Sequence, residues 1–142
     1  MNNSSFTIYN ASAGSGKTYT LTKEYLKILL KSPYDDAYKK ILAITFTNKA
    51  VEEMKTRIVN SLFEFSKDDT TSKSLQLLQD LSTETGLSIA TIKDKSKAII
   101  KNIIHNYSAF GISTIDKFTH KIIRTFAQDL ELPANFEIAL DT

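Results

Sequence analysis

Residues 11–18 read ASAGSGKT, with glycines placed closely before a lysine and a threonine. Except for an alanine at the first position, this order fits the pattern G-x-x-x-x-G-K-[ST]. In that pattern the glycines turn backbone N–H groups inward around an anion, the lysine reaches the β- and γ-phosphates, and the hydroxyl completes a Mg²⁺ shell. The loop therefore predicts a nucleotide and Mg²⁺ site, with Lys17 and Thr18 as catalytic residues and Thr18 on the metal. The phosphate-binding residues would be Ala11, Ser12, Ala13, Gly14, Ser15, Gly16, Lys17 and Thr18.

The segments on either side of this loop are expected to hold it in place. Residues 6–9, FTIY, are apolar and rich in β-formers, which predicts a short buried strand. A helix is expected from Thr18 to the stop at Ser32-Pro33, because apolar residues recur there at helical spacing. They are Leu21, Tyr25, Ile28 and Leu29. Strand, loop and helix together are the context that the motif needs, whereas a Gly/Ser turn with a solvated lysine is the alternative.

A second strand and helix are expected next. Residues 40–46, KILAITF, form a nearly continuous apolar run, as in a parallel strand covered on both faces. The following residues predict a long amphipathic helix capped by Thr47 or Asn48, with an apolar stripe of Val51, Met54, Ile58, Leu62 and Phe65. Parallel strands joined by right-handed crossovers bind ligands beyond their carboxyl ends. The loop at residues 11–18 and residues 45–49 should therefore share one edge of the sheet.

The middle of the chain reads as helical. Residues 66–73 are polar and resemble a linker. Beyond them, Leu75, Leu78 and Leu81 predict a short helix that ends near Gly86. A longer helix is expected from Ile89, Ile92, Ile99, Ile103 and Tyr107. We interpret residues 67–109 as a helical insertion in an α/β domain.

Residues 110–130 predict one more strand, residues 111–115, followed by a helix. The apolar face of this helix would consist of Ile115, Phe118, Ile122 and Phe126. Lys117, Lys121 and Arg124 would form a basic stripe beside it, which in isolation is usually a solvated face.

Two of these segments resemble motifs of the UvrD/Rep-type superfamily 1 DNA helicases. Residues 42–58, LAITFTNKAVEEMKTRI, are similar to motif Ia, and ASAGSGKT is a form that motif I often takes, alanine included. The resemblance implies that the nucleotide is ATP and that the edge after the second strand contacts single-stranded DNA. Phe46 would meet a base, and Thr47, Asn48 and Lys49 would touch phosphates. The alternatives are that Phe46 fills the core and that Asn48 caps a helix.

A third segment, residues 110–130, resembles the family's next DNA-contacting motif, T-[FI]-H-S-x-C-x-R-[IV]-L-R. Thr114, Ile115 and Arg124 fit, while Asp116 stands in place of histidine and Thr119 in place of cysteine. The resemblance implies DNA contacts by Thr114 and Lys117. An aspartate repels phosphate, so Asp116 is better suited to capping the helix. The long helical segment before this motif is similar to the RecB/AddA branch of helicase-nuclease subunits.

The expected fold is therefore α/β: a partial P-loop NTPase (RecA-like) domain with a parallel sheet and a helical insertion. Residues 1–66 and 110–142 would belong to the RecA-like domain, with residues 67–109 as the insertion. No apolar strand ends in the Asp-Glu pair of a Walker B motif, so we expect the front part of a larger helicase, inactive alone. The remaining helicase chain and a second helicase-nuclease subunit would be its partners.

The implied function is an ATP-dependent DNA helicase motor for recombinational DNA repair. Three alternatives stay open: a small nucleotide kinase, a non-catalytic nucleotide- or DNA-binding fragment, and a UvrD/Rep-like helicase without nuclease. A small kinase would leave residues 45–58 unexplained. Reading the gene beyond the last residue would separate the others.

Composition agrees with a globular cytoplasmic protein. The 142 residues include 18 Lys and Arg against 16 Asp and Glu, and a net charge of +2 is too small to indicate a nucleic-acid partner. There is no cysteine, which excludes disulfides and thiolate metal sites. Neither a signal peptide nor an apolar run of membrane-spanning length is visible, so no membrane partner is expected.

Overall fold

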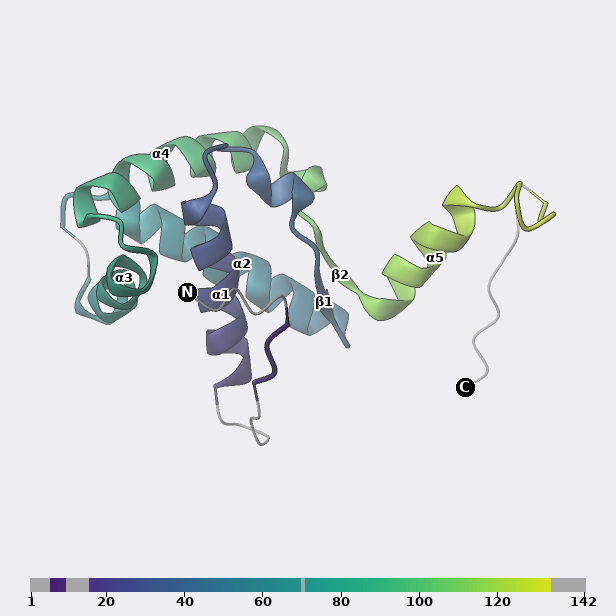
Figure 1. The fold of residues 1–142 in the computed structure, drawn as a ribbon, viewed down its shortest axis with the longest axis horizontal. Helices are drawn as coiled ribbons and strands as arrows, with labels where there is room; N and C mark the ends of the chain where they lie inside the picture. Colours follow the sequence, from purple (N-terminus) through teal and green to yellow (C-terminus); the bar gives the residue numbers. More distant parts are fainter. Residues whose placement is uncertain (1–5, 10–15, 70, 134–142) are drawn as a thin grey trace.

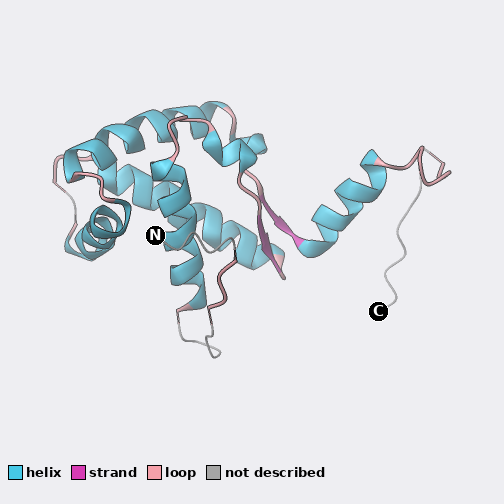
Figure 2. Cartoon of the chain, viewed as in Figure 1, coloured by secondary structure: helices cyan, strands magenta, loops and turns pink. Residues whose placement is uncertain are grey.

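The computed structural model describes residues 6–9, 16–69 and 71–133 (Figure 1). A body of helices carries a small parallel sheet on one side, and the last helix projects away from that body (Figures 1 and 2). The elements, in chain order, are α1 (Lys17–Lys31), η1 (Ala37–Lys40), β1 (Ala43–Thr45), α2 (Asn48–Ser66), α3 (Ser72–Thr85), α4 (Ile89–His105), η2 (Tyr107–Ala109), β2 (Ile112–Thr114) and α5 (Ile115–Thr125). Within the described ranges, no helix is long and apolar enough to cross a membrane.

Helix α2 forms as its apolar spacing predicts. The hydroxyl of Thr47 accepts a hydrogen bond from the backbone N–H of Ala50 at 3.1 Å, so Thr47 is the N-cap. Every residue of the predicted stripe is buried: Val51, Met54, Ile58, Leu62 and Phe65. Because the stripe lies on one side of the helix, α2 can pack against α1, α3 and α4 together.

The middle of the chain is helical, as expected. Gly86 ends α3 with a φ of 74°, a left-handed conformation that glycine adopts without steric cost. The hydroxyl of Ser88 then caps α4 by accepting a hydrogen bond from the N–H of Thr91 at 3.1 Å. Helix α4 packs along α2, and both α3 and α4 contribute to the same core as α1. The boundaries proposed for a helical insertion stay a prediction.

An aromatic cluster joins the sheet to the helices. The ring of Phe110, just before β2, lies 5.9 Å from that of Tyr25 on α1 and 6.0 Å from that of Tyr38 in η1. The Tyr38 hydroxyl donates a hydrogen bond to the side-chain oxygen of Asn102 on α4 at 2.9 Å. The first residues of both strands are thereby fixed to the helical core.

The sheet consists of β1 and β2, paired in parallel with Ala43 opposite Ile112 and Thr45 opposite Thr114. The N–H of Ala43 donates to the carbonyl of Gly111 at 2.9 Å. Parallel pairing is what the alternation of strands and helices predicts, although both strands are shorter than expected. Ile115, predicted to end the second strand, instead begins α5.

The strand expected at residues 6–9 is absent: these residues have no regular structure and are exposed. A hydrogen bond to the Glu24 carboxylate of α1 raises the pKa of the Tyr9 hydroxyl above its ordinary value. This segment therefore lies beside α1 rather than in the sheet. Strand geometry needs a neighbouring strand to pair with, and the two-stranded sheet of the described residues does not extend to it.

Burial on both faces was also a wrong expectation for the second strand. Leu42 and Ile44 are exposed at 51% and 40%, because no described element covers that side of the sheet. The apolar face of α5 is likewise uncovered, and no residue of that helix is buried. The exposed positions also include Leu21, Ile28, Leu75, Ile89 and Tyr107, each predicted from periodicity to be apolar core.

Candidate nucleotide- and DNA-binding site

Helix α1 begins at the residue where the phosphate-binding pattern requires a helix to begin. Gly16 precedes it with φ 82° and ψ 18°, a left-handed conformation that disfavours residues with a Cβ. Lys17 is the first helical residue and its side chain is exposed, while Thr18 is half-buried. The remaining predicted phosphate-binding residues lie outside the described ranges: Ala11, Ser12, Ala13, Gly14 and Ser15.

The start of α1 fits an anionic ligand such as a nucleotide phosphate. Gly16 has no side chain to cap the helix, and the N–H groups of residues 17–19 bond to no other described residue. These amides carry the positive end of the helix dipole. The described residues hold no group of three His, Cys, Asp or Glu that could bind a metal. A Mg²⁺ ion here would depend on the nucleotide and on the Thr18 hydroxyl.

Phe46 is the most exposed large apolar residue among the described ones, at 87%. It directly follows β1, and the chain around it is held by two hydrogen bonds. The Thr45 hydroxyl donates to the carbonyl of Thr47 at 3.2 Å, and the Thr47 hydroxyl caps α2. Asn48 and Lys49 lie in the first turn of α2 with exposed side chains. The core alternative for Phe46 is excluded in this arrangement, and Thr47 rather than Asn48 is the cap.

Thr114 occupies the matching position on β2 but faces inward. It is only 4% exposed, and its hydroxyl accepts a hydrogen bond from the N–H of Lys117 at 3.3 Å, which caps α5. In this arrangement Thr114 is not accessible to a DNA strand and instead orients the first turn of α5. Lys117 is exposed and follows it by one turn. Asp116, expected to cap the helix, lies in the first turn beside its positive end.

The two halves of the candidate site lie toward the same side of the molecule. Thr45 and Thr114 are opposite each other in the sheet, so Phe46 and the start of α5 share its carboxyl edge. Figure 1 shows the start of α1 and the ends of both strands toward the lower side of the view. The direct connection through a strand at residues 6–9, which the sequence predicts, does not form.

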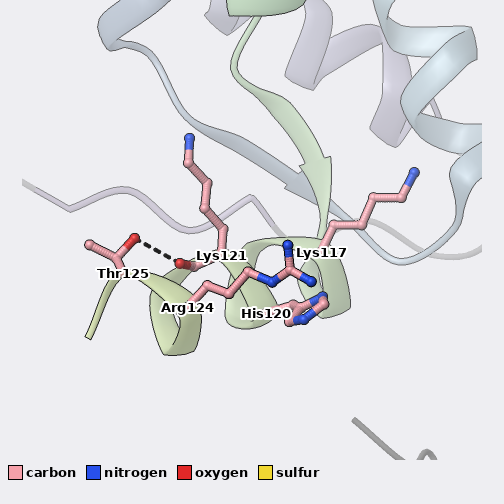
Figure 3. A pocket seen from close by; sticks show the side chains of 5 residues that line it. All are labelled: Lys117, His120, Lys121, Arg124 and Thr125. Carbon is pink, nitrogen blue, oxygen red and sulfur yellow. Dashed lines mark hydrogen bonds between the residues drawn. The ribbon is translucent and has the colours of Figure 1, made fainter. Parts of the chain in front are cut away.

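One residue near this edge was missed by the sequence reasoning. His120 lies with Lys117, Lys121, Arg124 and Thr125 around a hollow of about 430 Å³ on the outer face of α5 (Figure 3). The hydroxyl of Thr125 donates to the carbonyl of Lys121 at 2.8 Å. The helical spacing of His120 from the stripe would have revealed it, because residues three and four apart share a helix face.

Comparison with known proteins identifies the family. The model of the UvrD/REP helicase N-terminal domain matches residues 2–142. The chain belongs to this family. Several curated UvrD/REP-type relatives are named as ATP-dependent helicase/nuclease subunits of the AddA type. The protein from Clostridium botulinum is 36% identical over 95 residues, 67% of this chain and 8% of that protein. The protein from Lactobacillus acidophilus is 30% identical over 135 residues, 94% of this chain and 9% of that protein.

These UvrD/REP-type relatives are much longer than the chain, which spans less than a tenth of their length. A third relative of the AddA type, from Clostridium perfringens, is 35% identical over 95 residues, 67% of this chain and 7% of that protein. No solved structure matches the chain. The family assignment agrees with the resemblance seen in residues 11–18, 42–58 and 110–130.

Proposed function

We propose that this chain forms the front part of an ATP-dependent DNA helicase motor similar to the AddA-type helicase/nuclease proteins. It would belong to a P-loop NTPase domain of RecA-like fold, binding Mg-ATP at residues 11–18 and single-stranded DNA at residues 46–49 and at Lys117. The observation that carries the DNA half is the 87% exposure of Phe46 at the carboxyl edge of a parallel sheet. An apolar ring in that position is costly in water and is suited to stacking on a base.

The nucleotide half rests on the start of α1. Hydrolysis of bound Mg-ATP would supply the free energy for movement along DNA. The N–H groups at the start of α1 would bind phosphate oxygens, and the Lys17 ammonium would neutralise the β- and γ-phosphates. The Thr18 hydroxyl would hold the metal. The described strands end in Thr45 and Thr114, neither of which can provide the carboxylate of a Walker B motif.

The remaining parts of the proposal concern partners. Further segments of the helicase would have to supply the Walker B acid and arginine fingers from a second RecA-like domain. The names of the relatives support three further points: a role in recombinational repair, a cytoplasmic location and a second helicase-nuclease subunit.

The test is a titration of a labelled oligothymidylate with the 142-residue chain over a range of salt concentrations. Single strands should bind better than duplex, without sequence preference, and binding should weaken with salt. Lys49→Ala removes one phosphate contact, which should reduce the slope of log K against log salt by about 0.7 for a single strand. Lys101→Ala, an exposed lysine on α4, is the matched control. Equal slopes for the two variants would contradict the DNA assignment.

A further inference from the structure

A groove of about 610 Å³ lies between α5 and the residues that lead into β1 and β2. Its rim carries five lysines from separate parts of the chain: Lys39, Lys40, Lys55, Lys117 and Lys121. No aspartate or glutamate of the described residues lines it. Five ammonium groups around one hollow repel one another, so the groove is electrostatically suited to a polyanion.

The walls of the groove are apolar. Phe118, Ile122 and Phe126 come from α5, and Leu42 comes from the segment before β1. Ile122, Phe126 and Leu42 are exposed at 42%, 51% and 51%. A ligand that carries only charge would leave this surface in water. A ligand that alternates charged groups with flat apolar ones would use both the rim and the walls.

Neighbouring carboxylates neutralise only part of the rim. Lys39 has an ion pair with Asp36 at 3.4 Å, and Lys55 has a longer one with Glu52 at 3.9 Å. Lys40, Lys117 and Lys121 form no ion pair within the described ranges. The rim therefore keeps a net positive charge that a bound anion would stabilise.

The groove continues from the proposed DNA edge. Both strands run from the groove, at residues 39–42 and 108–113, toward the carboxyl edge at Thr45 and Thr114. Lys117 belongs to both features, because it lines the groove and lies one turn beyond the buried cap Thr114. Figure 3 shows Lys117 and Lys121 extending from one side of α5. A strand that leaves Phe46 can enter the groove past Lys117.

We propose that this groove holds a second stretch of the single strand bound at Phe46, with phosphates on the lysine rim and bases against the walls from α5. This inference rests on the proposed function, since it extends the same DNA site. A single strand is favoured over a duplex because its bases have free faces that can lie on Phe118 and Phe126. It is favoured over a second copy of this chain because a net charge of +2 and a lysine rim oppose self-association.

The experiment compares oligothymidylates of about 4 and about 16 nucleotides, the range of site sizes in single-strand-binding folds. The groove variant is Lys39→Gln/Lys40→Gln/Lys121→Gln. The control is Lys31→Gln/Lys97→Gln/Lys101→Gln, three lysines that are equally exposed and do not line the groove. The groove variant should bind the short oligomer like wild type. For the long oligomer, three lost phosphate contacts should lower the salt slope by about 2.

Two results would overturn the inference. In the first, the groove and control variants bind the long oligomer with the same affinity and salt slope. In the second, sedimentation shows a dimer of the wild-type chain that the groove variant loses, which would make the groove an interface between copies. Failure of the proposed function is distinct, because the short oligomer would then bind without dependence on Phe46 or Lys49. Thermal melting of both triple variants checks that they are folded.

Discussion

Thr45 and Thr114 are the last paired residues of the parallel sheet, and a helix follows each of them within three residues. Their hydroxyls act differently. Thr45 donates to the Thr47 carbonyl and helps to fix the turn that carries Phe46, whereas Thr114 is buried and caps α5. The pair thus places an exposed aromatic ring and a lysine-rich helix start at one edge, which is the geometry that a single-stranded polyanion requires.

Phe46→Ala should weaken single-stranded DNA binding by about 1–3 kcal/mol, the loss expected for one base–aromatic stack. The salt slope should stay nearly unchanged, because no charge is removed. The free energy of unfolding should also stay nearly unchanged, since the ring is 87% exposed. A DNA titration and a melting curve on the same preparation measure both quantities.

The matched control for Phe46 is Phe63→Ala. Phe63 is a half-exposed ring on α2 that lies beneath the Lys67 ammonium, away from the sheet edge. It should leave DNA binding intact. If Phe46→Ala instead lowered the free energy of unfolding by about 3–5 kcal/mol, as a buried phenylalanine would, with DNA affinity per folded molecule unchanged, Phe46 would belong to a core.

Lys17→Ala should abolish binding of Mg-ATP and Mg-ADP without unfolding the chain, because the side chain is exposed at the first position of α1. Calorimetry measures the binding, and Lys31→Ala at the other end of the same helix is the control. Equal heats for wild type and Lys17→Ala would show that the nucleotide does not bind at this loop. Affinity should be low even in wild type, because the described residues provide no adenine contact.

Helices could be predicted from the sequence better than strands. The stripe of α2 and its Thr47 cap depend on neighbours three or four positions away, so the local pattern contains the necessary information. Residues 6–9 and 40–46 are equally apolar, yet the first segment forms no strand and the second is half exposed. A strand needs partners from elsewhere in the chain, and composition cannot reveal whether those partners are present.

The candidate site was predictable in type but not in orientation. The motif resemblance selected Phe46 and Thr114 together, and the structure separates them into an exposed ring and a buried cap. The lysine groove could not be predicted, because Lys39 and Lys121 are far apart in the sequence and meet only through the packing of α5 against the sheet.

Glu84→Gln should flatten the acid side of the stability curve. Glu84 on α3 accepts hydrogen bonds from Lys23 at 2.6 Å and Lys27 at 2.9 Å, which lower the pKa of its carboxyl below the ordinary value of 4.5. A lowered folded-state pKa means that this stabilisation is complete above about pH 4.5 and is lost as the pH falls through the folded value.

The size of this effect should be small, because the three side chains remain partly exposed, and pairs of this kind contribute about 0–1 kcal/mol. Urea unfolding at neutral and acidic pH measures it as the difference between wild type and Glu84→Gln. Asp94→Asn, an exposed position on α4 without an ion pair to the described residues, is the control. A difference that grows toward low pH would contradict the assigned sign.

Gly111→Ala should destabilise the chain where the two strands are joined to the core. A Cβ at Gly111 would overlap the carbonyl oxygen of Ile41, and this backbone is fixed by the hydrogen bond from Ala43 to the Gly111 carbonyl. Overpacking of this kind costs about 1–3 kcal/mol. Gly86→Ala has a different cause for its cost, because its φ of 74° is left-handed and the surrounding space is open.

Asparagine separates the two causes by urea unfolding. It tolerates the left-handed region, so Gly86→Asn should recover much of the stability that Gly86→Ala loses. Gly111→Asn should be no better than Gly111→Ala, because its larger side chain meets the same carbonyl oxygen. Since Gly111 sets the spacing of the strands that carry Phe46 and Lys117, its variants should also weaken single-stranded DNA binding. Wild-type stability in Gly111→Ala would show that the close approach of Ile41 is not needed to hold the sheet.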